Sequence, residues 1–313
     1  MNAALRTLVA LALLAVFAPA AQALEFSPWS TAVNAENVLG TSAELNTPTD
    51  QDGCPIQSPD GLSLYMASNR PGGKGSLDIW VAHRESRDAP WGAPENLPAP
   101  INSTAADFCP TPIRGGGLFF VSRREIPGVT CGMGDIYLTR LNPGTGWETP
   151  EHLGCQADGG PNTPLDEQGP SYVKTGGPTL YFSSGIPSGP GATGDIYKSE
   201  RHGDGSFGPP ELVTSLSSPS VDIQPNVRHD GREVVLASNR TGTLGAQDLW
   251  VATRIGPNGP WSTPVNLGGA VNTSGFSETR PSLSWDGTTL YFGRALPTDP
   301  LTSDIFVSTR EAN

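Results

Sequence analysis

Charged side chains are scarce in this sequence, and basic ones are the scarcer kind. Asp, Glu, Lys and Arg make up 16% of the 313 residues, against about 25% in an average domain. The 19 Lys and Arg residues face 31 Asp and Glu residues, which gives a formal net charge of −12. So acidic a chain is a poor candidate for binding nucleic acid or anionic lipid head groups.

Motifs of the common enzyme classes are also missing. The chain contains no G-x-S-x-G nucleophile elbow, no H-E-x-x-H zinc motif and no phosphate-binding P-loop. It lacks the acidic calcium loop of the EF-hand type as well. We therefore predict no catalytic residue, no cofactor and no metal site.

Glycine and proline, in contrast, are abundant. The 38 Gly and 31 Pro residues make up more than a fifth of the 313 residues, against an average of about 12% for the two together. This composition favours a fold of short strands and many turns, and it excludes a coiled coil or a helical bundle. Hydrophobic residues, at 36% of the chain, still allow a sizeable core.

Residues 1–23 are predicted to be a secretory signal peptide. Arg6 supplies the positive charge, residues 8–18 are apolar, and Ala21-Gln22-Ala23 fits a cleavage site. A membrane-spanning helix would need about 20 apolar residues, so an uncleaved anchor is the weaker alternative. We expect residues 24–313 to form a single domain, periplasmic or secreted, monomeric and without membrane insertion.

Five similar units follow one another along residues 24–313. Each has a short strand after a proline, an Asp-Gly or Gly-Gly turn suited to a tight hairpin, and a second apolar strand. A Gly- and Pro-rich loop then leads to a third strand that begins with Asp. Four units add an aromatic residue that we expect to open a fourth strand. The repeat prolines are Pro55, Pro110, Pro170, Pro225 and Pro281, and the aromatic residues are Trp91, Trp147, Phe207 and Trp261.

Four short strands per unit, repeated around an axis, are typical of a β-propeller. The predicted fold is an all-β, five-bladed propeller, with a two-sheet sandwich as the alternative. The fifth unit stops before its fourth strand, while residues 28–34 (PWSTAVN) match residues 260–266 (PWSTPVN) of the fourth unit. We therefore expect the N-terminal strand to complete the last blade and close the ring.

The units resemble WD40-like propeller repeats of the TolB type. The resemblance is carried by Ser58-Pro59-Asp60-Gly61, by residues 68–73 (SNRPGG) with Asp78-Ile79-Trp80, and by residues 261–273. This variant is often found beside OmpA-type domains in bacterial envelopes. The resemblance implies the propeller fold, but fold does not fix function. TolB's partnerships depend on a further α/β domain and are not carried over.

An acidic residue stands three positions before each repeat proline. These five residues open the innermost strands, so we expect their carboxylates to circle the channel mouth on the face that carries the long loops. Neighbouring carboxylates resist joint ionisation unless something compensates them, which predicts a site for a cation or a basic ligand. The ring consists of Asp52, Asp107, Glu167, Asp222 and Glu278.

A structural interpretation of the acid ring stays open. Each acid could accept hydrogen bonds from a neighbouring loop or pair with an arginine near the end of the second strand: Arg70, Arg124, Arg240 or, slightly out of register, Arg294. In the third unit Ser183-Ser184-Gly185 replaces the Ser-x-Arg of the first, second and fourth units. Glu167 is therefore expected to lack a partner and to have a higher pKa than its neighbours.

Export makes two disulfides plausible among the four cysteines. All four map to the long-loop face of the first two units. We expect Cys131–Cys155 and Cys54–Cys109, the second only if the two Cα atoms come within about 7 Å. A zinc site is the alternative, disfavoured because the chain has no C-x-x-C spacing.

The leading functional interpretation is an exported, non-catalytic binding or scaffold protein of a bacterial envelope. Its partner would be an envelope protein, a glycan or a cationic ligand. The alternative is a glycan-active hydrolase that uses two channel-mouth carboxylates about 5–10 Å apart. Hydrolysis would require an open, water-filled pocket whose carboxylates are not tied up by arginines.

Overall fold

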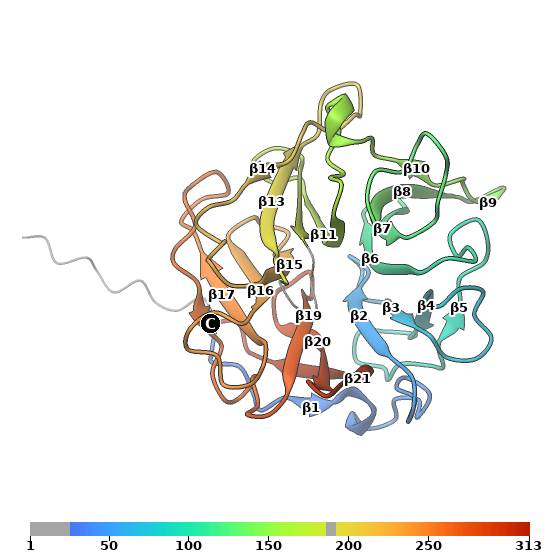
Figure 1. Ribbon diagram of the computed structural model, residues 1–313. Coiled ribbons are helices and arrows are strands. Elements are labelled where there is room, and N and C mark those ends of the chain that lie inside the picture. The colour runs from blue at the N-terminus through green and yellow to red at the C-terminus, as the bar shows by residue number, and fades with distance from the viewer. Residues whose placement is uncertain (1–25, 186–191) are drawn as a thin grey trace, which may run out of the picture.

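The computed structural model describes residues 26–185 and 192–313. These residues form five antiparallel sheets arranged radially around one axis, which is a five-bladed β-propeller (Figure 1). The predicted fold class is thereby confirmed. The predicted signal peptide, residues 1–23, lies outside the described residues.

Each blade runs from an inner strand at the axis to a short outer strand. Blade 1 contains β2 (Asp52–Gln57), β3 (Ser63–Ser68), β4 (Asp78–His83) and β5 (Glu95–Asn96). Blade 2 contains β6 (Asp107–Ile113), β7 (Gly117–Ser122), β8 (Asp135–Asn142) and β10 (Glu151–His152), with β9 (Gly146–Trp147) also paired to β8. Blade 3 contains β11 (Asp166–Val173), β12 (Thr179–Gly185), β13 (Asp195–Glu200) and β14 (Glu211–Leu212).

The last two blades follow the same order. Blade 4 contains β15 (Asp222–Val227), β16 (Glu233–Ser238), β17 (Asp248–Thr253) and β18 (Val265–Asn266). Blade 5 contains β19 (Ser277–Leu283), β20 (Thr289–Leu296), β21 (Asp299–Thr309) and, as its outer strand, β1 (Val33–Asn34). Two single turns of 3-10 helix, η1 (Ala35–Asn37) and η2 (Gln156–Asp158), lie in connecting segments.

The N-terminal segment closes the ring as predicted. In β1, Val33 lies opposite Val307 and Asn34 lies opposite Phe306 of β21, and Figure 1 shows the two strands side by side. The segment that follows β1 buries Ala35 and Leu45 in an apolar cluster with side chains of blades 1 and 5. The first and last described parts of the chain therefore share one core.

The fourth strands are shorter than the sequence led us to expect. The aromatic residues do not open them: β5, for example, begins at Glu95, four residues after Trp91. In the four blades with an internal outer segment, a proline stands directly before the paired residues: Pro94, Pro150, Pro210 and Pro264. Proline has no N–H to donate to the ladder, so regular pairing starts only after it.

Three of the four aromatic residues, Trp91, Phe207 and Trp261, instead pack under an arginine that directly follows the third strand. The Arg84 guanidinium lies 4.2 Å from the Trp91 ring centroid, and its Nε donates to the Gly61 carbonyl at 2.7 Å. Arg310 makes the same pair of contacts with Trp29 and Gly287, at 4.2 and 2.7 Å. Such cation–π contacts tie the hairpin turn and the outer segment to the third strand.

Both expected disulfides are present, Cys54–Cys109 and Cys131–Cys155. Two disulfides fit an oxidising compartment, which agrees with the expected periplasmic or extracellular location. Within residues 26–185 and 192–313, no helix is long and apolar enough to cross a membrane.

We expect removal of the closing segment to open the ring. A chain that starts at residue 48 loses β1 and the burial of Leu45, and it exposes the edge of β21. Loss of several kcal/mol in a domain of this size lowers the melting temperature by roughly 10 °C. Thermal unfolding, followed by circular dichroism beside a chain that starts at residue 24, measures the difference. Equal melting temperatures would contradict the closure role.

Candidate functional site at the channel mouth

Each inner strand carries a bulge directly before its repeat proline. The residues at this position have a left-handed backbone, with φ of +48° at Cys54, +47° at Cys109, +57° at Gly169, +54° at Gln224 and +56° at Arg280. In non-glycine residues this conformation costs about 1–3 kcal/mol and persists only where the surroundings enforce it. The bulge turns these five residues toward the axis, where they line one small cavity.

The channel is filled rather than open. Cys54 of β2 and Cys109 of β6 meet across it, with Cα atoms 4.9 Å apart, because both have the left-handed backbone that aims their side chains inward. Together with Gln224 and Arg280, the disulfide leaves a cavity of about 30 Å³. That is room for about one water molecule.

A chain of polar contacts crosses the channel mouth on the long-loop face. Gln168 Nε2 donates to Asp166 Oδ2 at 3.0 Å, and Gln224 Nε2 donates to Gln168 Oε1 at 2.9 Å. The Arg280 backbone N–H donates to Gln224 Oε1 at 3.0 Å. With its amide oxygen facing the guanidinium, Gln51 accepts from Arg280 at 2.6 and 3.1 Å. Burial lowers the pKa of Arg280 to about 10.

Asp166 is the carboxylate of this cluster. Its Oδ2 pairs with Arg123 Nη2 at 2.9 Å, while its Oδ1 has no hydrogen-bond partner among the described residues. The carboxylate is 1% exposed, whereas the Arg123 side chain that covers it is 45% exposed. The ion pair therefore joins a buried carboxylate to a half-exposed arginine side chain.

The acid ring predicted from the sequence lies behind this cluster, and all five of its residues are 0% exposed. Four of them pair with the arginines named in the structural interpretation. Asp52 meets Arg70 at 2.5 Å, and Asp107 meets Arg124 at 2.7 Å. The other two ion pairs join Asp222 to Arg240, with Nε 3.1 Å from Oδ1, and Glu278 to Arg294 at 2.7 Å.

The same carboxylates hold the loops that connect the blades. Asp52 accepts from the Thr47 backbone N–H at 2.6 Å, and Asp107 accepts from that of Ser103 at 2.7 Å. Ser218 and Thr273 donate equivalently to the acids of blades 4 and 5. Four ring members thus have their charge compensated within the protein, although Oε2 of Glu278 has no hydrogen-bond partner among the described residues. A ligand role for the ring stays a prediction, and it now depends on Glu167.

Glu167 lacks an arginine, as the Ser183-Ser184-Gly185 sequence predicted. It accepts from the hydroxyls of Thr163 and Ser184, and its Oε2 has no partner among the described residues. Burial raises the pKa of Glu167 to about 8, against the lowering effect of these two hydrogen bonds. Burial also raises the pKa of Glu278, to about 7, with Arg294 opposing the shift. Glu167 is therefore largely protonated at neutral pH.

Sequence reasoning missed the residues that meet at the axis. Asp166 is adjacent to Glu167, but its position in the other units is taken by Gln51, Ala106, Val221 and Ser277. A search for features common to all five units passes over such a residue. The signal that could have found it is the reverse one, an acidic residue that occurs at this position in a single unit.

Comparisons with known proteins place the fold in a class. No family model matches the chain, and no curated protein matches it. Among solved structures, a thermostable family-43 glycoside hydrolase superposes with a TM-score of 0.57 at 15% identity, covering 87% of this chain and 92% of that one. An endo-arabinase from Bacteroides thetaiotaomicron gives 0.53 at 15% identity, covering 86% and 96%. At such identities the likeness establishes the five-bladed propeller fold alone.

A TolB-like structure is also found, but it is less similar. The putative TolB from Agrobacterium tumefaciens has a TM-score of 0.45 at 18% identity, covering 79% of this chain and 70% of that one. The leading functional interpretation, a non-catalytic binding or scaffold protein, is corrected here. Solved structures that share this architecture over most of their length include glycoside hydrolases, which do not support that interpretation, and the alternative is taken up below.

Loss of a ring carboxylate's charge should destabilise the protein strongly where the acid pairs with an arginine and only weakly at Glu167. Asp222→Asn leaves Arg240 buried without its counter-charge, and we expect it to cost about 3–5 kcal/mol. Glu167→Gln replaces a mostly neutral group by a neutral one and should cost less than about 1 kcal/mol at pH 6. Urea unfolding of both variants measures the two values. Equal losses would show that Glu167 holds no special position in the ring.

The raised pKa of Glu167 also predicts a pH dependence. Its folded pKa of about 8 lies above the ordinary value of 4.5, so the folded state binds the proton more tightly. That contribution to stability is complete below pH 4.5 and is lost as pH rises through 8. Measured between pH 5 and 9, the stability of Glu167→Gln relative to the natural protein should rise with pH. A difference that stays constant would contradict the shifted pKa.

Proposed function

We propose that this protein is a glycan-active hydrolase whose substrate meets the channel mouth on the long-loop face. The observation that carries the proposal is the polar cluster that runs from Asp166 through Gln168 to the axial residue Gln224, in a fold shared with family-43 glycoside hydrolases. Amide, guanidinium and carboxylate groups supply the donors and acceptors that sugar hydroxyls need. Gln168, Gln224 and Arg280 provide them beside Asp166.

The proposal moves the reacting carboxylate from the acid ring to Asp166. Glycoside hydrolysis generally uses carboxyl groups that flank the scissile bond, and they must contact the substrate. The ring carboxylates are fully buried, and four of them are neutralised by arginine, so they serve the scaffold. Asp166 opens the inner strand β11 on the long-loop face and has one oxygen, Oδ1, without a partner among the described residues. That oxygen can take a proton from water or face a developing positive charge on the sugar ring.

Substrate access on this proposal requires Arg123 to swing away from Asp166. The Arg123 side chain is 45% exposed, so its guanidinium can turn toward water. Asp166, which is buried, then loses its counter-charge at a cost of about 3–5 kcal/mol, which binding of the glycan has to offset. The movement would uncover Asp166 at the moment when a glycan occupies the face. A small rearrangement of one side chain thus replaces the open pocket that the sequence led us to require.

The test is hydrolysis by the chain that starts at residue 24. A glycan array first identifies the polysaccharide bound, with arabinan and xylan included, and release of reducing sugar then measures cleavage. Asp166→Asn should lower the rate at least about a hundredfold and leave the melting temperature within a few degrees. Asp204→Asn, at an exposed turn of the opposite face, is the matched control and should keep full activity.

Two results would overturn the proposed function. The first is that no glycan of the panel is bound or cleaved. The second is cleavage that Asp166→Asn leaves unchanged, which would place the reacting group elsewhere on the surface.

A further inference from the structure

Blade 2 carries a histidine at a point on the long-loop face where three other blades carry an asparagine. In three blades the Asp that opens the third strand accepts a hydrogen bond from an Asn amide of the outer strand. Asn96 donates to Asp78 at 3.0 Å, and Asn266 donates to Asp248 at 2.7 Å; Asn34 and Asp304 of blade 5 form the third such pair, at 3.1 Å. In blade 2 the outer-strand residue is His152 instead.

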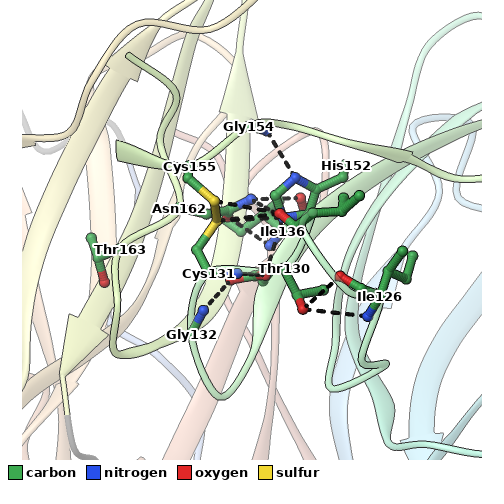
Figure 2. Close-up of a disulfide and its surroundings, with 12 residues drawn as sticks. Ile126, Thr130, Cys131, Gly132, Ile136, His152, Gly154, Cys155, Asn162 and Thr163 are labelled. Atoms are coloured by element: carbon green, nitrogen blue, oxygen red, sulfur yellow. Dashed lines mark hydrogen bonds and ion pairs between the residues drawn. A yellow bond between two sulfur atoms is a disulfide. The ribbon is translucent and has the colours of Figure 1, made fainter. Parts of the chain in front are cut away.

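His152 keeps the contact of the asparagine but brings a metal-ligating nitrogen. Its Nε2 lies 3.1 Å from Asp135 Oδ2 and 3.7 Å from Cys131 Sγ. The three ligand atoms all lie within 4.8 Å of one another. Both contacts are made by Nε2, so this nitrogen, the Asp135 oxygen and the Cys131 sulfur surround one point, as the ligands of a metal ion do. Figure 2 shows the imidazole beside the disulfide.

A fourth donor is covalently attached to this triangle. Cys155 Sγ is bonded to Cys131 Sγ, so opening the disulfide delivers a second sulfur to the same place. Zn–S bonds are about 2.3 Å and Zn–N bonds about 2.0 Å, which places sulfur and nitrogen about 3.6 Å apart around a tetrahedral ion. The observed separation of 3.7 Å between Cys131 Sγ and His152 Nε2 already fits that geometry.

We propose that the reduced protein binds one Zn²⁺ in a tetrahedral site at this edge of blade 2, and that the disulfide and the zinc site are alternative states of one switch. The ligands are Cys131, Cys155, His152 and Asp135. The other disulfide, Cys54–Cys109, has no such companions, because the side chains that line its cavity include no histidine or acid. Absence of a C-x-x-C spacing is no obstacle, since the ligands come as two pairs from two segments, Cys131 with Asp135 and His152 with Cys155.

Reduction of the Cys131–Cys155 disulfide precedes binding of the metal. A dithiol reductant gives two electrons and two protons to the disulfide, which becomes two thiols, while the dithiol itself becomes a disulfide. Zn²⁺ then displaces both thiol protons to water. In the disulfide form, Nδ1 of His152 accepts from the Gly154 N–H at 3.1 Å. In the zinc form, His152 binds the metal through Nε2 and carries its proton on Nδ1, so this hydrogen bond has to break. Gly154 adjoins Cys155, so opening of the disulfide frees that segment to turn away.

Cobalt replaces zinc in the test, because tetrahedral Co²⁺ bound to thiolates absorbs visibly. The chain that starts at residue 24 is reduced with excess dithiol, freed of it by gel filtration under argon, and titrated with Co²⁺. We expect one Co²⁺ per chain, thiolate-to-metal absorption, displacement by Zn²⁺, and no binding to the oxidised protein. Near-ultraviolet circular dichroism follows the fold throughout.

Two variants locate the site. His152→Asn restores the residue that three other blades use, so the variant should fold, yet we expect its metal affinity to fall at least about tenfold. A Cys131→Ser and Cys155→Ser double variant keeps Cys54 and Cys109 and should show no thiolate absorption. The proposal is overturned if reduced natural protein and double variant give the same spectrum, if His152→Asn binds Co²⁺ as tightly as the natural protein, or if the oxidised protein binds equally.

Discussion

One buried ion pair, repeated around the axis, holds the mouth of the propeller together. In each of four blades a carboxylate at the start of the inner strand meets an arginine near the end of the second strand, and both reach the loop arriving from the previous blade. Arg70 donates to the carbonyls of Glu44 and Leu45 at 2.7 and 2.9 Å, while Asp52 accepts from the Thr47 N–H. A charge that would be costly alone is satisfied on every side, so the loops that carry the face are fixed by the ring.

This arrangement separates structure from chemistry on the same strands. The residue that repeats in every blade is the ring acid, and in four blades it pairs with an arginine. The residues that line the axial cavity differ from blade to blade: a disulfide, a glycine, a glutamine and an arginine. A rigid ring lets a few variable side chains define a site without endangering the fold, which is how propellers come to host unrelated functions.

The sequence was informative where a feature recurred. Five prolines at similar spacing, the Asp-Gly turns and the matched residues 28–34 and 260–266 were enough to predict the blades and the closing strand. The missing arginine after Ser183-Ser184 predicted the unusual environment of Glu167. The left-handed residues before the prolines were not foreseen, because a proline normally drives the preceding residue to extended conformations. Without that bulge, neither the plug at Cys54 nor the polar cluster at Asp166 could be placed.

Pairing of β1 with β21 has a consequence for how such a chain is made. The strand β1 is synthesised before all five inner strands, yet it pairs with β21 of the last blade, where Val33 lies opposite Val307. Inner blades can form one after another as the chain is delivered, but the ring stays open until its final strand arrives. Completion of the fold therefore depends on contacts between the two extremes of the sequence, the slowest kind for a chain to find. A chain that ends before β21 leaves β1 and the edge of β20 without a partner strand.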